Sequence, residues 1–81
     1  PEIIKAMAKL PEEYRSAIIL CDVEGFSYQE IADILEVPIG TVRSRLNRAR
    51  TRLQQMLLGY VQENHPDLLV KREVGDKEKE P

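Results

Sequence analysis

A long stretch of helical periodicity lies between two prolines, Pro38 and Pro66. Proline cannot continue a helix, so these two residues bound the element. Apolar residues recur at every third or fourth position between them and fall on one face of a helix: Val42, Leu46, Ala49, Leu53, Met56, Leu57 and Tyr60. The pattern predicts a long helix that opens between Pro38 and Thr41, ends near Asn64 and packs its apolar face against other elements.

Two short helices are expected near the start of the chain. The first runs from Glu2 to Leu10, because a residue before proline is disfavoured in a helix; one face carries Ile3, Ala6, Met7 and Leu10. The second opens at Pro11, where a missing N–H costs nothing, and it should bury Tyr14, Ala17, Ile18 and Cys21. Gly25 is placed to end this helix in the left-handed conformation.

A third helix has a clear start signal in the segment 27–30, Ser-Tyr-Gln-Glu. This is a capping box, in which Ser27 and Glu30 each satisfy a backbone N–H of the other. The helix should bury Ile31, Ala32, Ile34 and Leu35 and stop before Pro38. Turns between two such helices often carry glycine where this chain has Glu36; if φ is positive there, glutamate costs about 1 kcal/mol relative to glycine.

These elements predict an all-α fold, a four-helix domain over residues 1–65. Its third and fourth helices form a helix-turn-helix, and the long C-terminal helix is the recognition helix. Residues 66–81 are mostly charged, and we expect them to be a disordered tail. The chain has 81 residues and begins with Pro1 rather than Met, so we interpret it as one domain cut from a longer protein.

The charge distribution points to a nucleic-acid partner, although the net charge is −2. No acidic residue occurs from Val37 to Gln62, and this segment contains five arginines: Arg43, Arg45, Arg48, Arg50 and Arg52. A solvated helix face is the alternative, but such faces gain from acid–base pairs four residues apart, and none of these arginines has one. A basic stripe on an acidic chain is typical of DNA-binding domains.

A helical wheel of about 100° per residue sorts this stripe into roles. Opposite the core-facing Val42 lie the residues expected to meet base edges: Ser44, Asn47, Arg48 and Thr51. The flanking residues are expected to meet the phosphate walls of the major groove: Arg43 and Arg50 on one side, Arg45 and Arg52 on the other. Thr41, at the start of the helix, completes the predicted DNA-binding set.

Catalysis, cofactors and membrane insertion are not indicated. The chain has no glycine-rich phosphate loop and no triad, so we interpret it as a non-enzyme. One cysteine and one histidine are too few for a zinc site, and Cys21, at an apolar position, is expected to be a structural thiol. There is no signal-peptide pattern and no apolar run of roughly 20 residues, which favours a cytoplasmic protein.

Three segments carry a resemblance to a known family: Leu10–Arg15, Asp22–Ala32 and Pro38–Arg50. Together they resemble region four of bacterial sigma factors, most of all the extracytoplasmic-function (ECF) group. The resemblance covers about Leu10 to Leu53, and its Gly-Thr-Val-Arg-Ser-Arg block is quite specific.

The resemblance implies a function in transcription initiation and a set of partners. Region four of this family binds the minus-35 promoter element and docks on the β flap of the RNA polymerase core, and an anti-sigma factor holds many members inactive. By motif position, the residues that match its DNA-contacting positions are Arg43, Ser44, Asn47 and Arg48.

Two other functions fit the pattern less well. A dimeric response regulator also carries a Thr-Val step in its helix-turn-helix, and the oligomeric state would separate it from a sigma factor. A helical adaptor for protein interactions would show no salt-dependent DNA binding.

Overall fold

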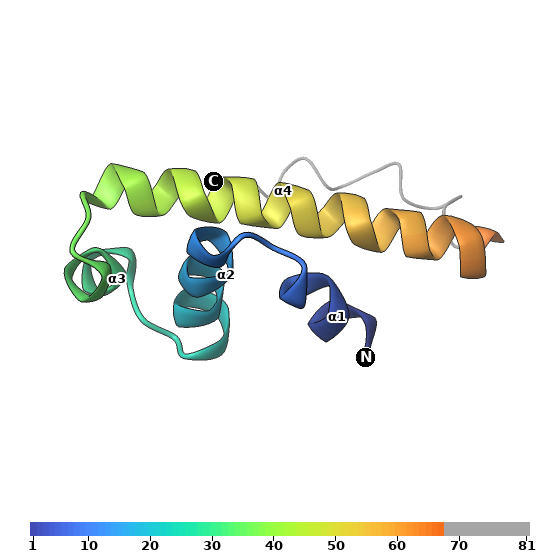
Figure 1. Ribbon diagram of the computed structural model, residues 1–81, viewed down its shortest axis with the longest axis horizontal. Coiled ribbons are helices and arrows are strands. Elements are labelled where there is room, and N and C mark those ends of the chain that lie inside the picture. The colour runs from blue at the N-terminus through green and yellow to red at the C-terminus, as the bar shows by residue number, and fades with distance from the viewer. Residues whose placement is uncertain (68–81) are drawn as a thin grey trace.

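Residues 1–67, the part of the chain that the computed structural model describes, form five helical elements. In chain order these are α1 (Glu2–Ala8), α2 (Glu12–Ile18), the π-helical η1 (Ile19–Val23), α3 (Tyr28–Leu35) and α4 (Ile39–Asn64). Figure 1 shows α4 along the full length of the molecule, with α1, α2 and α3 on one side of it. Because η1 continues α2, the predicted all-α fold of four helices is confirmed. Most of the predicted tail, residues 68–81, lies outside the described residues.

Helix α4 has the predicted bounds and the predicted buried face. It starts after its N-cap Pro38 and ends at Asn64, where the N–H of the C-cap His65 donates to the carbonyl of Val61 at 2.7 Å. Its buried residues are Val42, Leu46, Ala49 and Leu53. Met56 and Leu57, one turn further on, are only partly buried.

The core lies between the first half of α4 and the three short helices. Its largest fully buried side chains are Ile31 from α3 with Val42 and Leu46 from α4. Ala17 and Ile18 of α2 and Ala6 of α1 are also buried. Burying a large aliphatic side chain contributes about 1.5–3 kcal/mol, so this cluster anchors α4 to α1, α2 and α3.

The boundary between α1 and α2 differs from the prediction by two residues. Helix α1 ends at Ala8 rather than Leu10, because the N–H groups of Lys9 and Leu10 bond to carbonyls only three residues back, at 3.0 and 3.1 Å. Pro11 is the N-cap of α2. The Leu10 side chain is buried as part of the core, and its carbonyl accepts a 2.6 Å hydrogen bond from Arg15 Nη1.

Four residues predicted to be buried are not fully buried: Ile34 is exposed, and Tyr14, Cys21 and Leu35 are only partly buried. Ile34 is 49% exposed, because the buried face of α3 is centred between Ile31 and Ala32 and Ile34 lies at its edge. Cys21 is only partly buried. It lies in η1, whose hydrogen bonds span five residues instead of four; the wider turn moves Cys21 out of register with the buried Ala17.

The capping box predicted at the start of α3 is present. The Ser27 Oγ accepts from the N–H of Glu30 at 3.1 Å, and the Glu30 carboxylate accepts from the N–H of Ser27 at 2.8 Å, which completes the capping box. At the other end Glu36 is left-handed, with φ 59° and ψ 50°. Gly25 also has a positive φ, 81°, as predicted. The three features fix where α3 begins and where the chain turns into α4.

Candidate DNA-binding surface

The helix-turn-helix is formed by α3, the left-handed turn at Glu36 and the first half of α4. Ala32 is 4% exposed where α3 packs on the core, so a small side chain lets the two helices approach closely. Val37 and Ile39, from the turn and the first residue of α4, are partly buried against the same core. This packing fixes the direction in which the first half of α4 presents its outer face.

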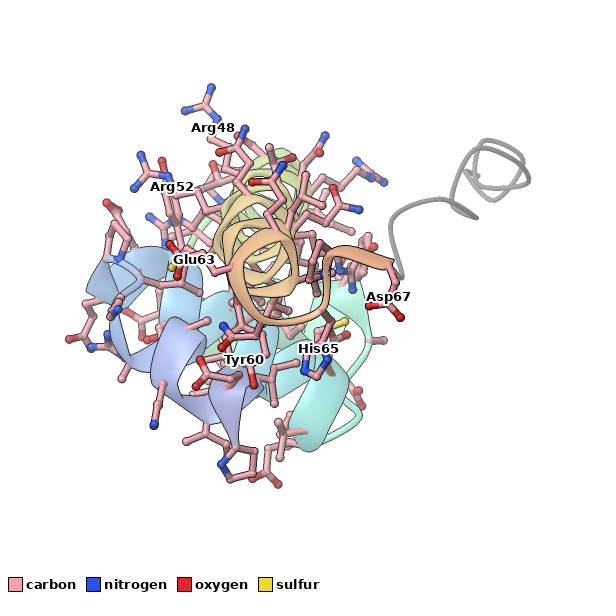
Figure 2. All side chains as sticks on the ribbon, turned by 90° about the vertical axis from the view of Figure 1, so that its right-hand side faces the viewer. Arg48, Arg52, Tyr60, Glu63, His65 and Asp67 are labelled. Atoms are coloured by element: carbon pink, nitrogen blue, oxygen red, sulfur yellow. The ribbon has the colours of Figure 1, made fainter. Side chains whose placement is uncertain are left out.

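The four residues predicted for the centre of the recognition face are all exposed: Ser44, Asn47, Arg48 and Thr51. They alternate with Val42, Leu46 and Ala49, which are almost fully buried on the opposite side of α4. Figure 2, a view along α4, shows Arg48 projecting away from the other helices. The helical wheel therefore predicted correctly that these four side chains are exposed.

The flanking arginines have different surroundings. Arg43 is exposed and forms no ion pair within residues 1–67. Arg52 places its guanidinium carbon 5.0 Å from the centre of the Tyr14 ring, a cation–π contact with α2. Thr41, at the start of α4, is partly buried.

Two flanking arginines are paired with acids from earlier elements. Arg50 Nη2 lies 2.9 Å from Asp22 Oδ1, and it also donates to Cys21 Sγ at 3.6 Å. Arg45 Nη2 lies 3.7 Å from Glu13 Oε1. The sequence did not predict either pair, because only acid–base pairs within the helix can be recognised from spacing and these partners are distant in sequence.

The Arg50 contacts also affect ionisation. Partial burial acts to lower the pKa of Arg50, but its contacts with Tyr28 and Asp22 outweigh burial and raise the pKa. The pKa of Cys21 is raised, chiefly by burial and then by Asp22, against the opposing influence of Arg50. A raised pKa lowers the thiolate fraction, which agrees with the interpretation of Cys21 as a structural thiol.

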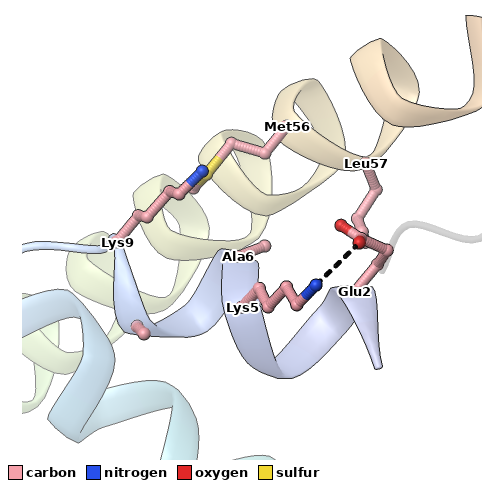
Figure 3. A pocket seen from close by; sticks show the side chains of 7 residues that line it. Glu2, Lys5, Ala6, Lys9, Met56 and Leu57 are labelled. Atoms are coloured by element: carbon pink, nitrogen blue, oxygen red, sulfur yellow. Dashed lines mark ion pairs between the residues drawn. The ribbon is translucent and has the colours of Figure 1, made fainter. Parts of the chain in front are cut away.

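Outside this surface, the described residues contain a pocket as a candidate site. It lies between α1 and α4 and is lined mainly by aliphatic groups and by Glu2 and Lys5, which form an ion pair at 3.6 Å (Figure 3). Within residues 1–67 no group of three or more acidic, His or Cys side chains could hold a metal ion. None of the helices in this range is long and apolar enough to cross a membrane.

Comparison with known families identifies this arrangement. The family model for sigma-70, region 4, matches residues 2–53, from the first residue of α1 to the last buried residue of α4. The chain belongs to the sigma-70 region 4 family. The match includes the complete helix-turn-helix and every residue of the predicted DNA-binding set.

Similar curated proteins are ECF RNA polymerase sigma factors. SigE of Mycolicibacterium smegmatis is 48% identical over 58 residues, 72% of this chain and 23% of that protein. EcfG of Rhodopseudomonas palustris is 39% identical over 75 residues, 91% of this chain and 41% of that protein. The sigma-E factor of Escherichia coli K12 is 50% identical over 48 residues, 59% of this chain and 25% of that protein. The chain thus spans only part of these relatives, between 23% and 41% of their length.

Membership in this family has three consequences. The resemblance to region four of ECF sigma factors, inferred from the sequence, is confirmed. Region 4 of these sigma factors binds the −35 promoter element and is not an enzyme. The response-regulator and adaptor alternatives are therefore not supported.

Proposed function

We propose that this chain binds the −35 promoter element as region 4 of an ECF sigma factor, and that the whole protein directs RNA polymerase to its promoters in the cytoplasm. The observation that carries the proposal is the outer face of α4, on which exposed polar and arginine side chains lie opposite the buried Val42 and Leu46. The major groove of DNA admits one helix, and arginine and asparagine are suited to guanine and adenine. Family membership supports the same function.

Individual roles follow from position on α4. The residues that we assign to base edges lie at the centre of the exposed face: Ser44, Asn47, Arg48 and Thr51. Arg43, which matches a DNA-contacting position of the family, lies beside them. The residues assigned to the phosphate walls are Thr41, Arg43, Arg45, Arg50 and Arg52, because phosphate contacts flank the groove and position the helix.

The protein partners belong to the proposal as well. Family resemblance indicates the β flap of the RNA polymerase core and, for a regulated member, an anti-sigma factor. In the described part of the chain, large apolar side chains available for such protein contacts are exposed on several elements: Ile3, Ile4, Val23, Phe26, Ile34 and Leu58.

Salt dependence of DNA binding tests the central claim. If the domain neutralises about four phosphates, log K should fall with log salt with a slope of roughly −3.6. The measurement is a fluorescence-anisotropy titration on a duplex that the domain selects from a random-sequence pool, repeated between low and physiological salt. Affinity that does not change with salt would remove the electrostatic basis of the proposal.

A further inference from the structure

Acidic side chains from outside α4 hold one arginine on each flank of the proposed recognition face. On one flank, Asp22 of η1 forms the 2.9 Å ion pair with Arg50. On the other flank, Glu13 of α2 lies 3.7 Å from Arg45, whose side chain is only 24% exposed. Arg43 and Arg48, by contrast, form no ion pair within residues 1–67.

These pairs reduce the charge that the flanks can offer to DNA. A guanidinium whose N–H groups point at a carboxylate must break this ion pair before it can fully neutralise a phosphate. If the pair stays intact, the negative charge of the carboxylate offsets the positive charge that the phosphate meets. Arg50 is the better held of the two, because one nitrogen contacts both Asp22 and the sulfur of Cys21, and a 2.9 Å contact between ions is a charge-assisted hydrogen bond. Exposed ion pairs contribute little to stability, so the pairs lower phosphate binding rather than abolish it.

We propose that Asp22 and Glu13 restrain the sequence-independent DNA affinity of this domain by holding Arg50 and Arg45 away from the phosphates. The inference depends on the DNA-binding function proposed above. It assigns a role to two acids that lie outside the recognition helix, and it predicts that removing either acid makes binding tighter and more sensitive to salt.

Asp22→Asn gives the sharpest test, since it removes the carboxylate charge and keeps the shape of the side chain. A freed Arg50 should add one phosphate contact and steepen the log–log salt slope by about 0.9. Between about 50 and 200 mM salt, the loss of affinity should then grow by roughly 3.5-fold compared with the unmodified chain. Because phosphates carry no sequence information, binding to the selected duplex and to its scrambled version should tighten by the same factor.

Glu24→Gln is the matched control for charge alone. Glu24 lies two residues after Asp22, is exposed and forms no ion pair within residues 1–67, so its substitution removes the same formal charge without freeing an arginine. We expect the slope of this variant to equal that of the unmodified chain. Equal slopes for Asp22→Asn and Glu24→Gln would overturn the inference.

A second background shows whether Asp22 acts through Arg50. In a chain that carries Arg50→Ala, adding Asp22→Asn should leave the slope unchanged, because the restrained group is already absent. If Asp22→Asn steepened the salt slope as much in the Arg50→Ala background as in the unmodified chain, Asp22 would act by repelling DNA directly. That result would also overturn the inference. Coupling between the two substitutions is the expected result for residues in contact.

The other flank offers an independent pair of variants. Glu13→Gln should steepen the slope in the same direction, while Glu12→Gln should not, because Glu12 pairs at 3.7 Å with Arg15 and not with α4. If the unmodified chain shows no salt-dependent binding, the proposed function fails. If it binds as expected but Asp22→Asn and Glu13→Gln match their controls, only the inference fails.

Discussion

Arg48 and Arg52 lie one turn apart on α4, yet their side chains have different surroundings. Arg48 is exposed and projects away from the other helices (Figure 2). Arg52 is also exposed, but its guanidinium stands 5.0 Å from the centre of the Tyr14 ring. A side chain anchored on α2 lies at the edge of the recognition face, while an unanchored one can enter the groove.

These surroundings predict different effects of truncation. Arg48→Ala should cost about 1–3 kcal/mol of binding free energy and relax the sequence preference, because it removes a base contact. Arg52→Ala should weaken binding to all sequences alike, since it removes only a phosphate contact. Affinities for the selected duplex and its scrambled version, measured at one salt concentration, separate the two effects. Equal and sequence-blind losses for both variants would contradict the assignment of Arg48 to base reading.

At the residue scale, the sequence predicted which side chains of α4 are exposed but not what they contact. Periodicity places Arg45 and Arg50 on the flanks, and the structure agrees. Their partners Glu13 and Asp22 come from α2 and η1, and only the packing of those elements on α4 brings the charges together. Contacts between elements of this kind leave no local pattern in the sequence.

At the scale of the element, the turn between α3 and α4 contains a glutamate in the left-handed backbone conformation, which is unfavourable for residues with a Cβ atom. Glu36 has φ 59°, and its N–H donates to the carbonyl of Ala32, which closes α3. The N–H of Val37 donates to the same carbonyl at 3.0 Å. The left-handed residue thus lets two consecutive N–H groups meet one carbonyl at the end of the helix.

Glu36→Gly should stabilise the domain by about 1 kcal/mol, because glycine adopts positive φ without the clash of a Cβ atom. Urea unfolding followed by circular dichroism measures the change. Glu36→Ala, which removes the charge but keeps the strain, should bring no such gain. If Glu36→Ala stabilised as much as Glu36→Gly, charge rather than backbone strain would be the cause.

Conversely, Gly25→Ala should destabilise the domain by about 1 kcal/mol. The cause is its φ of 81° alone, since a Cβ there meets nothing within 4 Å.

The elements with strong local signals were predicted well, and the one without such a signal was missed. Two prolines bound α4, and a capping box starts α3, so both helices have the expected ends. The π-helical η1 has no such signal, because its sequence, Ile-Leu-Cys-Asp-Val, suits an ordinary helix. Gly25, with its positive φ, and Phe26, whose N–H donates to the carbonyl of Leu20 at 3.0 Å, then connect η1 to α3.

At the scale of the whole molecule, the short helices support only part of α4. The last buried residue of α4 is Leu53, and the partly buried Met56 and Leu57 face α1. The final turns up to Asn64 contain no buried residue. The proposed recognition residues, from Thr41 to Arg52, all lie within the supported part.

We therefore expect residues beyond Pro66 to be dispensable for DNA binding. A chain that ends at His65 should fold and should bind with equal or slightly higher affinity, because the removed segment is mildly acidic and its repulsion is screened over a Debye length of about 8 Å. Both chains are compared on one duplex at one salt concentration. Binding that weakens by tenfold or more, about 1.4 kcal/mol, would mean that this segment contacts either DNA or the core.

The continuity of α4 sets a geometric relation between its two ends. A straight helix rises about 1.5 Å per residue, so Tyr60 lies roughly 18 Å along the axis from Arg48, with no hinge between them in a helix that runs unbroken from Ile39 to Asn64. A protein bound to the far end of α4 would therefore be held at a fixed distance from the proposed recognition residues, and at a fixed rotation about the helix axis. Inserting one residue between the two ends would rotate one end relative to the other by about 100°. The number of residues in this helix therefore sets both the spacing and the relative orientation of its two ends.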